Sequence, residues 1–127
     1  MAITTCYCGS DLPIADCCQP ILAGKKIAGT PEALMRSRYT AFCTLDFNYL
    51  EASVHAQYRE QFDRATNEAW AREATFERLE ILSTHAQGDD GEVTFKAHFV
   101  LDGKRHVHRE HSTFRRENGV WYFCKGE

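Results

Sequence analysis

Long apolar runs are missing from this sequence, and so is a large excess of charge of either sign. No apolar run approaches the roughly 18 to 20 residues that a membrane span requires, so we expect no membrane partner. The opening stretch, MAITTCYCGS, lacks the charged and apolar regions of a secretory signal, which predicts a cytoplasmic location. With a formal net charge of −3, the chain has no overall basic field that would attract nucleic acid.

Proline is also scarce, with three residues in 127, and the chain contains no internal repeat or low-complexity segment. The remaining composition is that of a globular protein, with 43% hydrophobic and 26% charged residues. Eight Phe, five Tyr and two Trp supply enough apolar side-chain volume for a core. This length suits one domain, or one domain with a small appendage.

Cysteine, in contrast, is concentrated at one end. Four of the six cysteines lie in the segment CYCGSDLPIADCC, at positions Cys6, Cys8, Cys17 and Cys18. Cytoplasmic thiols stay reduced, so such a cluster indicates metal or redox chemistry rather than a disulfide framework. Zn²⁺ takes four thiolate ligands in a tetrahedron at roughly 2.3 Å each. We therefore expect a zinc site, with Gly9 allowing the tight turn after the first pair.

A redox or disulfide cluster is the alternative interpretation of these cysteines. A disulfide between the adjacent Cys17 and Cys18 is strained, and C-x-C lacks the two-residue gap of thioredoxin-type sites. Four thiolates would also leave no open position on the metal for water or substrate. The pattern thus favours structural zinc over catalytic zinc.

The same segment resembles the SEC-C motif, a short zinc-binding sequence that usually reads C-P-C-G-S-G, then eight residues between the inner cysteines, then C-C or C-H. Tyr7 and Asp11 depart from that pattern at positions that are not ligands. Two further stretches, PEALMRSRYTAF and REHSTFRRENGVWYF, resemble the bacterial YchJ family, in which Arg is common where this chain has His111. The resemblance implies a zinc-binding N-terminus on an α+β domain like nuclear transport factor 2 (NTF2), in a family whose biochemical role is largely unassigned.

We accordingly divide the chain into a zinc-binding segment and connector, residues 1–28, and an α+β domain, residues 29–127. Thr30, followed by Pro31, predicts the start of a helix. Asp46 can cap a second, short helix, and residues 57–73 form a polar stretch compatible with helix.

The residue pattern then becomes typical of β-strands, which we predict at residues 75–84, 92–101, 104–116 and 119–125. The two later connections contain Asp102-Gly103 and Asn118-Gly119, which are strong two-residue hairpin signals. Helices followed by an antiparallel meander predict an α+β fold, with the helices packed on a curved sheet of about four strands.

The hairpin turns also predict the register, pairing Phe95 with Glu110 and Phe114 with Phe123. Side-chain alternation then places one set of residues on the core face. This set is Val93, Phe95, Ala97, Phe99, Phe114, Trp121 and Phe123, together with His106, His108, Glu110 and Ser112.

A carboxylate among aromatic side chains is costly unless it is paired. We therefore expect a buried ion pair between Glu110 and Arg38 of the covering helix, with Ser112 as a further hydrogen-bond partner. The alternative is that these groups form the floor of a ligand pocket, with His106 and His108 as acid–base groups. The candidate pocket set is Arg36, Arg38, Tyr39, His106, His108, Glu110 and Ser112.

Other reactive residues carry weaker signals. The predicted register puts His98 and His111 on one sheet face and His106 and His108 on the other, which disfavours a second metal site. The run KRHVHREHSTFRR could contact phosphate, although such runs are commonly the exposed half of a strand. We expect Cys43 and Cys124 to pack in or against the core as small hydrophobic residues.

These observations lead to two functional hypotheses. The first is a cytoplasmic interaction or adaptor protein whose structural zinc segment docks, as the SEC-C resemblance implies, on a protein or ribosome-associated partner. The second is a small-molecule-binding or enzymatic domain with a pocket around Arg38, Tyr39, His108 and Glu110. An open cavity at Glu110 favours the second, and a filled core with a closed Arg–Glu pair removes it. The sequence does not determine the oligomeric state.

Overall fold

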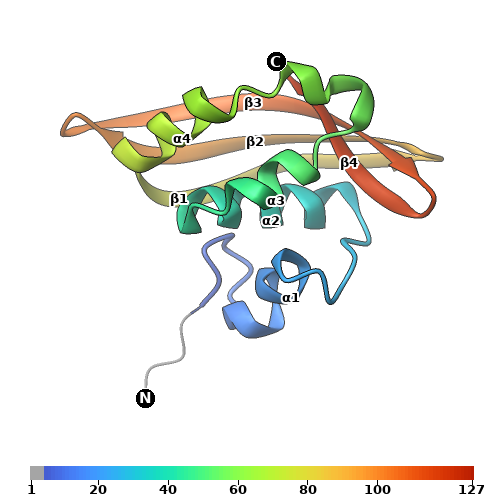
Figure 1. Ribbon diagram of the computed structural model, residues 1–127. Coiled ribbons are helices and arrows are strands. Elements are labelled where there is room, and N and C mark those ends of the chain that lie inside the picture. The colour runs from blue at the N-terminus through green and yellow to red at the C-terminus, as the bar shows by residue number, and fades with distance from the viewer. Residues whose placement is uncertain (1–4) are drawn as a thin grey trace.

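The computed structural model describes residues 5–127 and contains a four-stranded antiparallel sheet in the order β1-β2-β3-β4 (Figure 1). The strands are β1 (Thr75–Gln87), β2 (Asp90–Leu101), β3 (Lys104–Glu117) and β4 (Val120–Gly126). Helices precede the sheet in the chain and cover one of its faces. The predicted α+β class and meander order are thereby confirmed.

Within residues 5–127, six helical elements lie before the sheet. They are η1 (Ile14–Asp16), α1 (Cys18–Leu22), α2 (Pro31–Thr44), α3 (Phe47–Ala52), η2 (Ala56–Gln61) and α4 (Arg64–Glu73). Both predicted caps are present, because Thr30 Oγ1 accepts a hydrogen bond from the Ala33 amide and Asp46 Oδ1 accepts one from the Tyr49 amide. None of the described helices is long and apolar enough to cross a membrane.

The register of the last three strands follows the prediction. Phe95 pairs with Glu110, and Phe114 pairs with Phe123. A bulge between Thr113 and Phe114 then shifts the pairing of the final residues of β4. This shift brings Gly126 opposite Ser112, next to the Glu110 side chain.

Two details differ from the sequence prediction. The residues between the first two predicted strands, 85–91, extend β1 to Gln87 and start β2 at Asp90, which leaves a short turn at Gly88 and Asp89. The polar stretch 57–73 is divided into η2 and α4. The division occurs because Asp63 accepts hydrogen bonds from the amide and the hydroxyl of Thr66, which starts a new helix there.

The main core lies between α2 and the inner face of the sheet. Leu34, Met35 and Tyr39 of α2 are buried against apolar residues that include Val93 and Phe114. The N-terminal segment packs on the side of α2 that faces away from the sheet (Figure 1). Its buried cysteines form a separate small cluster. One helix therefore lies between two distinct sites.

Candidate metal centre and cavity

The cysteine loop is held in shape by its own backbone. The Cys6 amide donates to the Leu12 carbonyl at 2.8 Å, and the Gly9 amide donates to the Cys6 carbonyl at 3.3 Å. Gly9 has a φ of +84°, a left-handed conformation that favours glycine. The turn expected after the C-x-C pair is thus present, and it directs both side chains to the same side.

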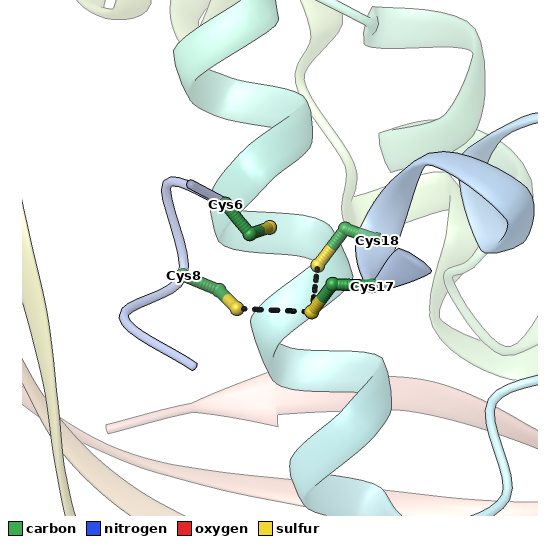
Figure 2. A group of neighbouring side chains, drawn as sticks. All are labelled: Cys6, Cys8, Cys17 and Cys18. Atoms are coloured by element: carbon green, nitrogen blue, oxygen red, sulfur yellow. Dashed lines mark hydrogen bonds between the residues drawn. The ribbon is translucent and has the colours of Figure 1, made fainter. Parts of the chain in front are cut away.

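The return of the chain brings the second pair of cysteines to the first. Cys17 immediately precedes α1 and Cys18 is its first residue, so their side chains approach Cys6 and Cys8 from the opposite side (Figure 2). The four Sγ atoms all lie within 4.8 Å of one another. The distance from Cys8 to Cys17 is 3.6 Å and that from Cys17 to Cys18 is 3.9 Å. A tetrahedron with metal–sulfur bonds of roughly 2.3 Å has edges of about 3.8 Å.

This cluster is shielded from solvent and anchored to α2. Cys6, Cys8 and Cys18 are at most 5% exposed, and Cys17 is half-buried. The Cys6 sulfur lies 3.6 Å from Thr40 Oγ1. Arg36 donates to the Cys8 carbonyl at 2.5 Å and to Glu32 at 2.9 Å. These contacts fix the loop on the outer face of the helix.

The thiols share protons unequally. The pKa of Cys8 is lowered to about 4, chiefly because the Cys18 thiol donates a hydrogen bond to its sulfur. The same bond raises the pKa of Cys18, and burial raises the pKa of Cys17. Cys8 is therefore the first sulfur to become a thiolate, and a bound cation would displace the remaining protons.

The donor set fits a divalent metal ion. Four sulfur atoms from one loop converge at close to tetrahedral spacing, and all four cysteines are free thiols. Among the described residues, this is the only cluster of three or more His, Cys, Asp or Glu side chains with metal-binding geometry. The four-cysteine site can therefore hold a metal without any open position for a reactant.

A cavity of about 580 Å³ lies between the inner face of the sheet and the helices. Nearly half of the residues that line it are aromatic, among them Phe42 of α2, Trp70 of α4, and Phe76 and Phe99 of the strands. Trp70 packs edge-on against both Phe76 and Phe99, with centroid distances of 5.2 and 5.3 Å. Contacts among these aromatic side chains therefore hold the cavity wall in place.

Four of the candidate pocket residues line this cavity: Arg38, Tyr39, His108 and Glu110. The other three lie elsewhere. Arg36 belongs to the cysteine site, and the exposed ring of His106 stacks on Phe99 at 5.4 Å.

The third, Ser112, is fully buried and donates to Glu110 Oε2 at 2.7 Å. Its hydrogen bond to Glu110 is the one expected from the sequence. Ser112 therefore orients the Glu110 carboxylate through this hydrogen bond and does not line the cavity itself.

The predicted ion pair between Arg38 and Glu110 is wrong. Arg38 instead donates through Nη1 to the Leu50 carbonyl at 2.8 Å and to Ser53 Oγ at 2.5 Å. Glu110 is only half-buried, and its carboxylate lies 3.0 Å from the His108 ring and 2.7 Å from the Ser112 hydroxyl, so histidine and serine take the place of the expected arginine. The carbonyl at the end of α3 offers a closer partner for the guanidinium, and this choice leaves the cavity open.

Several wall residues were not expected from the sequence. Tyr58 and Gln61 of η2, Asn67 of α4, and Phe62 between these two elements line the cavity, in a stretch for which the sequence predicted only a polar segment compatible with helix. Gly126 also contributes, and a Cβ there would overlap the Glu110 carboxyl group. No local pattern distinguishes a residue that faces a cavity from one that fills a core.

The remaining cysteines pack as predicted. Cys124 is buried, and Cys43 is half-buried against the main core. Burial raises the pKa of the Cys43 thiol to about 12, so it remains protonated at neutral pH. His98 and His111 lie near Glu80 and Glu92, respectively, rather than near another histidine.

Comparison with known proteins gives consistent matches along the chain. Residues 30–126 match the family model described as "YchJ, middle NTF2-like domain". A UPF0225 protein of Geobacter sulfurreducens is 37% identical over 124 residues, which are 95% of this chain and 77% of that protein. The YchJ protein of Shigella dysenteriae serotype 1 is 37% identical over 123 residues, covering 95% and 81%, respectively.

A solved structure extends the similarity to the cysteine segment. The solution structure of a SEC-C motif protein from Rhodopseudomonas palustris aligns with a TM-score of 0.92 and 42% sequence identity. The alignment covers 98% of each chain. The similarity therefore includes the N-terminal segment as well as the sheet and helices.

Proposed function

The chain belongs to the YchJ family, and from that premise we propose that it is a zinc-containing binding protein whose NTF2-like cavity holds a small organic molecule. The observation that carries the proposal is the cavity of about 580 Å³ at Glu110, which no Arg38–Glu110 ion pair closes. This volume lies within the range of typical small-molecule sites, which are mostly apolar with a few polar groups.

Zinc would have a structural role in this protein. Cys6, Cys8, Cys17 and Cys18 would hold it, and the metal would supply the folding energy that so short a segment lacks. This role suits the cytoplasm, where thiols stay reduced and available as ligands. The chemistry of any ligand would then belong to the cavity, where His108 and Glu110 form a ready acid–base pair.

The test is a thermal-shift screen with small aromatic and aliphatic compounds of every charge class, read against a variant with a filled cavity. Ala97→Phe places a ring in the cavity, and Ala86→Phe makes the same change at an exposed position of the sheet. We expect compounds that raise the Tm of the wild type and of Ala86→Phe but not that of Ala97→Phe. If no compound distinguishes the two variants, the proposal is wrong.

A second function, as an adaptor, is favoured by the surface of the cysteine loop. Tyr7 and Leu12 are 48% and 50% exposed and lie on the same short loop, so they offer apolar surface for contact with a partner. They could dock on a protein or ribosome-associated partner. Crosslinked pull-downs would compare the wild type with a Tyr7→Ser, Leu12→Ser double variant that keeps all four cysteines. Identical recovery of partners would argue against the adaptor role.

A further inference from the structure

Arg38 is a buried positive charge on the wall of the cavity. The residue is only 5% exposed. Its guanidinium lies 4.4 Å from the centroid of the Phe123 ring and donates through Nη1 to the Leu50 carbonyl and the Ser53 hydroxyl. These partners orient the group, but none of them carries a negative charge.

No carboxylate within residues 5–127 forms an ion pair with Arg38. The acid on the same cavity, Glu110, accepts its hydrogen bonds from Ser112 and His108 instead. Burial without an acidic partner lowers the pKa of Arg38 to about 10, although Glu110 and Tyr49 act in the opposite direction. A buried charge of this kind is costly unless it is paired.

The Arg38 guanidinium also has hydrogen-bond donors that no described residue uses. Both of its hydrogen bonds come from Nη1, so Nε and Nη2 make no hydrogen bond to residues 5–127. No side-chain nitrogen of the described residues is both fully buried and unbonded, so these two atoms reach accessible surface. Nε and Nη2 form the edge of a guanidinium that binds a carboxylate through two parallel hydrogen bonds.

We propose that the ligand of this cavity is an organic monocarboxylate, with a planar apolar body among the aromatic walls and its carboxylate on Nε and Nη2 of Arg38. This inference rests on the proposed function and names the class of its ligand. A single charge is favoured because one buried cation is available and Glu110 would repel a second negative charge. The other cation on the wall, Lys125, is exposed and lies 3.6 Å from Glu127.

Three compounds with the same ring system test the charge class: 2-naphthoate, 2-naphthamide and 2-naphthylmethylammonium. Calorimetric titration of the zinc-loaded protein would give their dissociation constants. We expect 2-naphthoate to bind about tenfold more tightly than the amide, because a charge-assisted bond adds that much affinity, and the ammonium to bind most weakly. Equal binding of 2-naphthoate and the amide would overturn the charge class while leaving the cavity proposal intact. If none of the three binds, the ligand class and the proposed function both fail.

Substitutions then assign the preference to Arg38. Arg38→Gln should abolish the preference for 2-naphthoate, whereas Arg109→Gln, the same change on the exposed outer face of β3, should preserve it. Because Arg38→Gln can also weaken folding, Glu110→Gln gives an independent readout. It removes the nearby negative charge and should strengthen 2-naphthoate relative to the amide by about threefold or more. An unchanged ratio in Glu110→Gln, or a preserved preference in folded Arg38→Gln, would overturn the assignment.

Discussion

Gly91 allows the first turn of α2 to lie directly on the sheet. A Cβ at this position would overlap Cγ of Pro31 and lie 3.1 Å from the Trp121 ring. Both neighbours are rigid and buried, so neither can move aside cheaply. The requirement comes from contact between residues that are far apart in the chain.

We therefore expect Gly91→Ala to lower the free energy of unfolding by about 1–3 kcal/mol, the usual cost of overpacking. Gly29→Ala is the matched control, because a Cβ there would have no atom within 4 Å. Its free energy of unfolding should stay within about 0.5 kcal/mol of the wild type. Urea denaturation measures both, and equal stabilities would contradict the close packing at Gly91.

The four cysteines of the loop also differ from the other two in what they can bind. Cys17 lies 3.6 Å from Cys8, whereas Cys43 packs against the main core. Cys17→Ser should therefore lower the affinity for zinc by about a hundredfold or more, because it removes one of four thiolates. Cys43→Ser should leave the affinity unchanged.

The affinity of the intact site should fall as the pH is lowered, since protons compete with the metal for the thiolates. Cys17 and Cys18, whose pKa values are raised in the metal-free cluster, account for most of that competition. Competition with a chromophoric chelator measures affinity at each pH. An affinity that is independent of pH would contradict thiolate ligation.

At the scale of elements, the segment between α3 and η2 closes the edge of β4. Val54 forms a parallel bridge to Phe123, and the His55 amide donates to the Phe123 carbonyl at 2.7 Å. The buried His55 ring accepts from the Gln57 amide through Nδ1, so its Nε2–H donates to Glu117 at 2.6 Å. One side chain thus connects a helix start to the sheet.

Removing the His55 ring should weaken the contact between the start of η2 and the sheet. We expect His55→Ala to lower the free energy of unfolding by about 1–3 kcal/mol, through the lost hydrogen bond to a carboxylate and the space left behind. His85→Ala, at an exposed position of β1, should change it by less than about 0.5 kcal/mol. Chemical denaturation of the two variants provides the comparison. Equal effects would mean that His55 does not anchor this edge.

At the scale of the whole molecule, α2 separates two sites that have different sources of stability. Among the described hydrophobic residues, Ile14 and the partly buried Cys17 are the ones that pack on the three buried thiols, while the main core contains ten buried residues. Arg36 and Thr40 contact the cluster from one side of the helix, and Arg38 and Tyr39 line the cavity on the other.

Chelation should therefore unfold the N-terminal segment but leave the rest of the protein folded. We expect amides up to about residue 20 to lose protection in hydrogen exchange after metal removal, because so short a segment buries little apolar surface. The amides of β2 and β3 should keep their protection. Loss of protection in those strands would show that the metal holds the entire fold together.

The sequence by itself determined the features that depend on local chemistry. Thr30 and Asp46 cap helices because their side chains bond to amides within the next turn. The Asp102-Gly103 and Asn118-Gly119 turns set the register, since side chains alternate strictly from a two-residue turn. The convergence of four cysteines likewise follows from their spacing and from the turn at Gly9.

Only the tertiary structure decided which groups pair across the molecule. Arg38 binds the end of α3 and not Glu110, because the Leu50 carbonyl and the Ser53 hydroxyl lie within hydrogen-bond distance of its guanidinium. The strand register alone does not indicate where α3 lies. Arg36 lies at the cysteine loop because α2 presents its other face there. The cavity, too, results from how far the helices stand from the sheet, a distance that no stretch of sequence encodes locally.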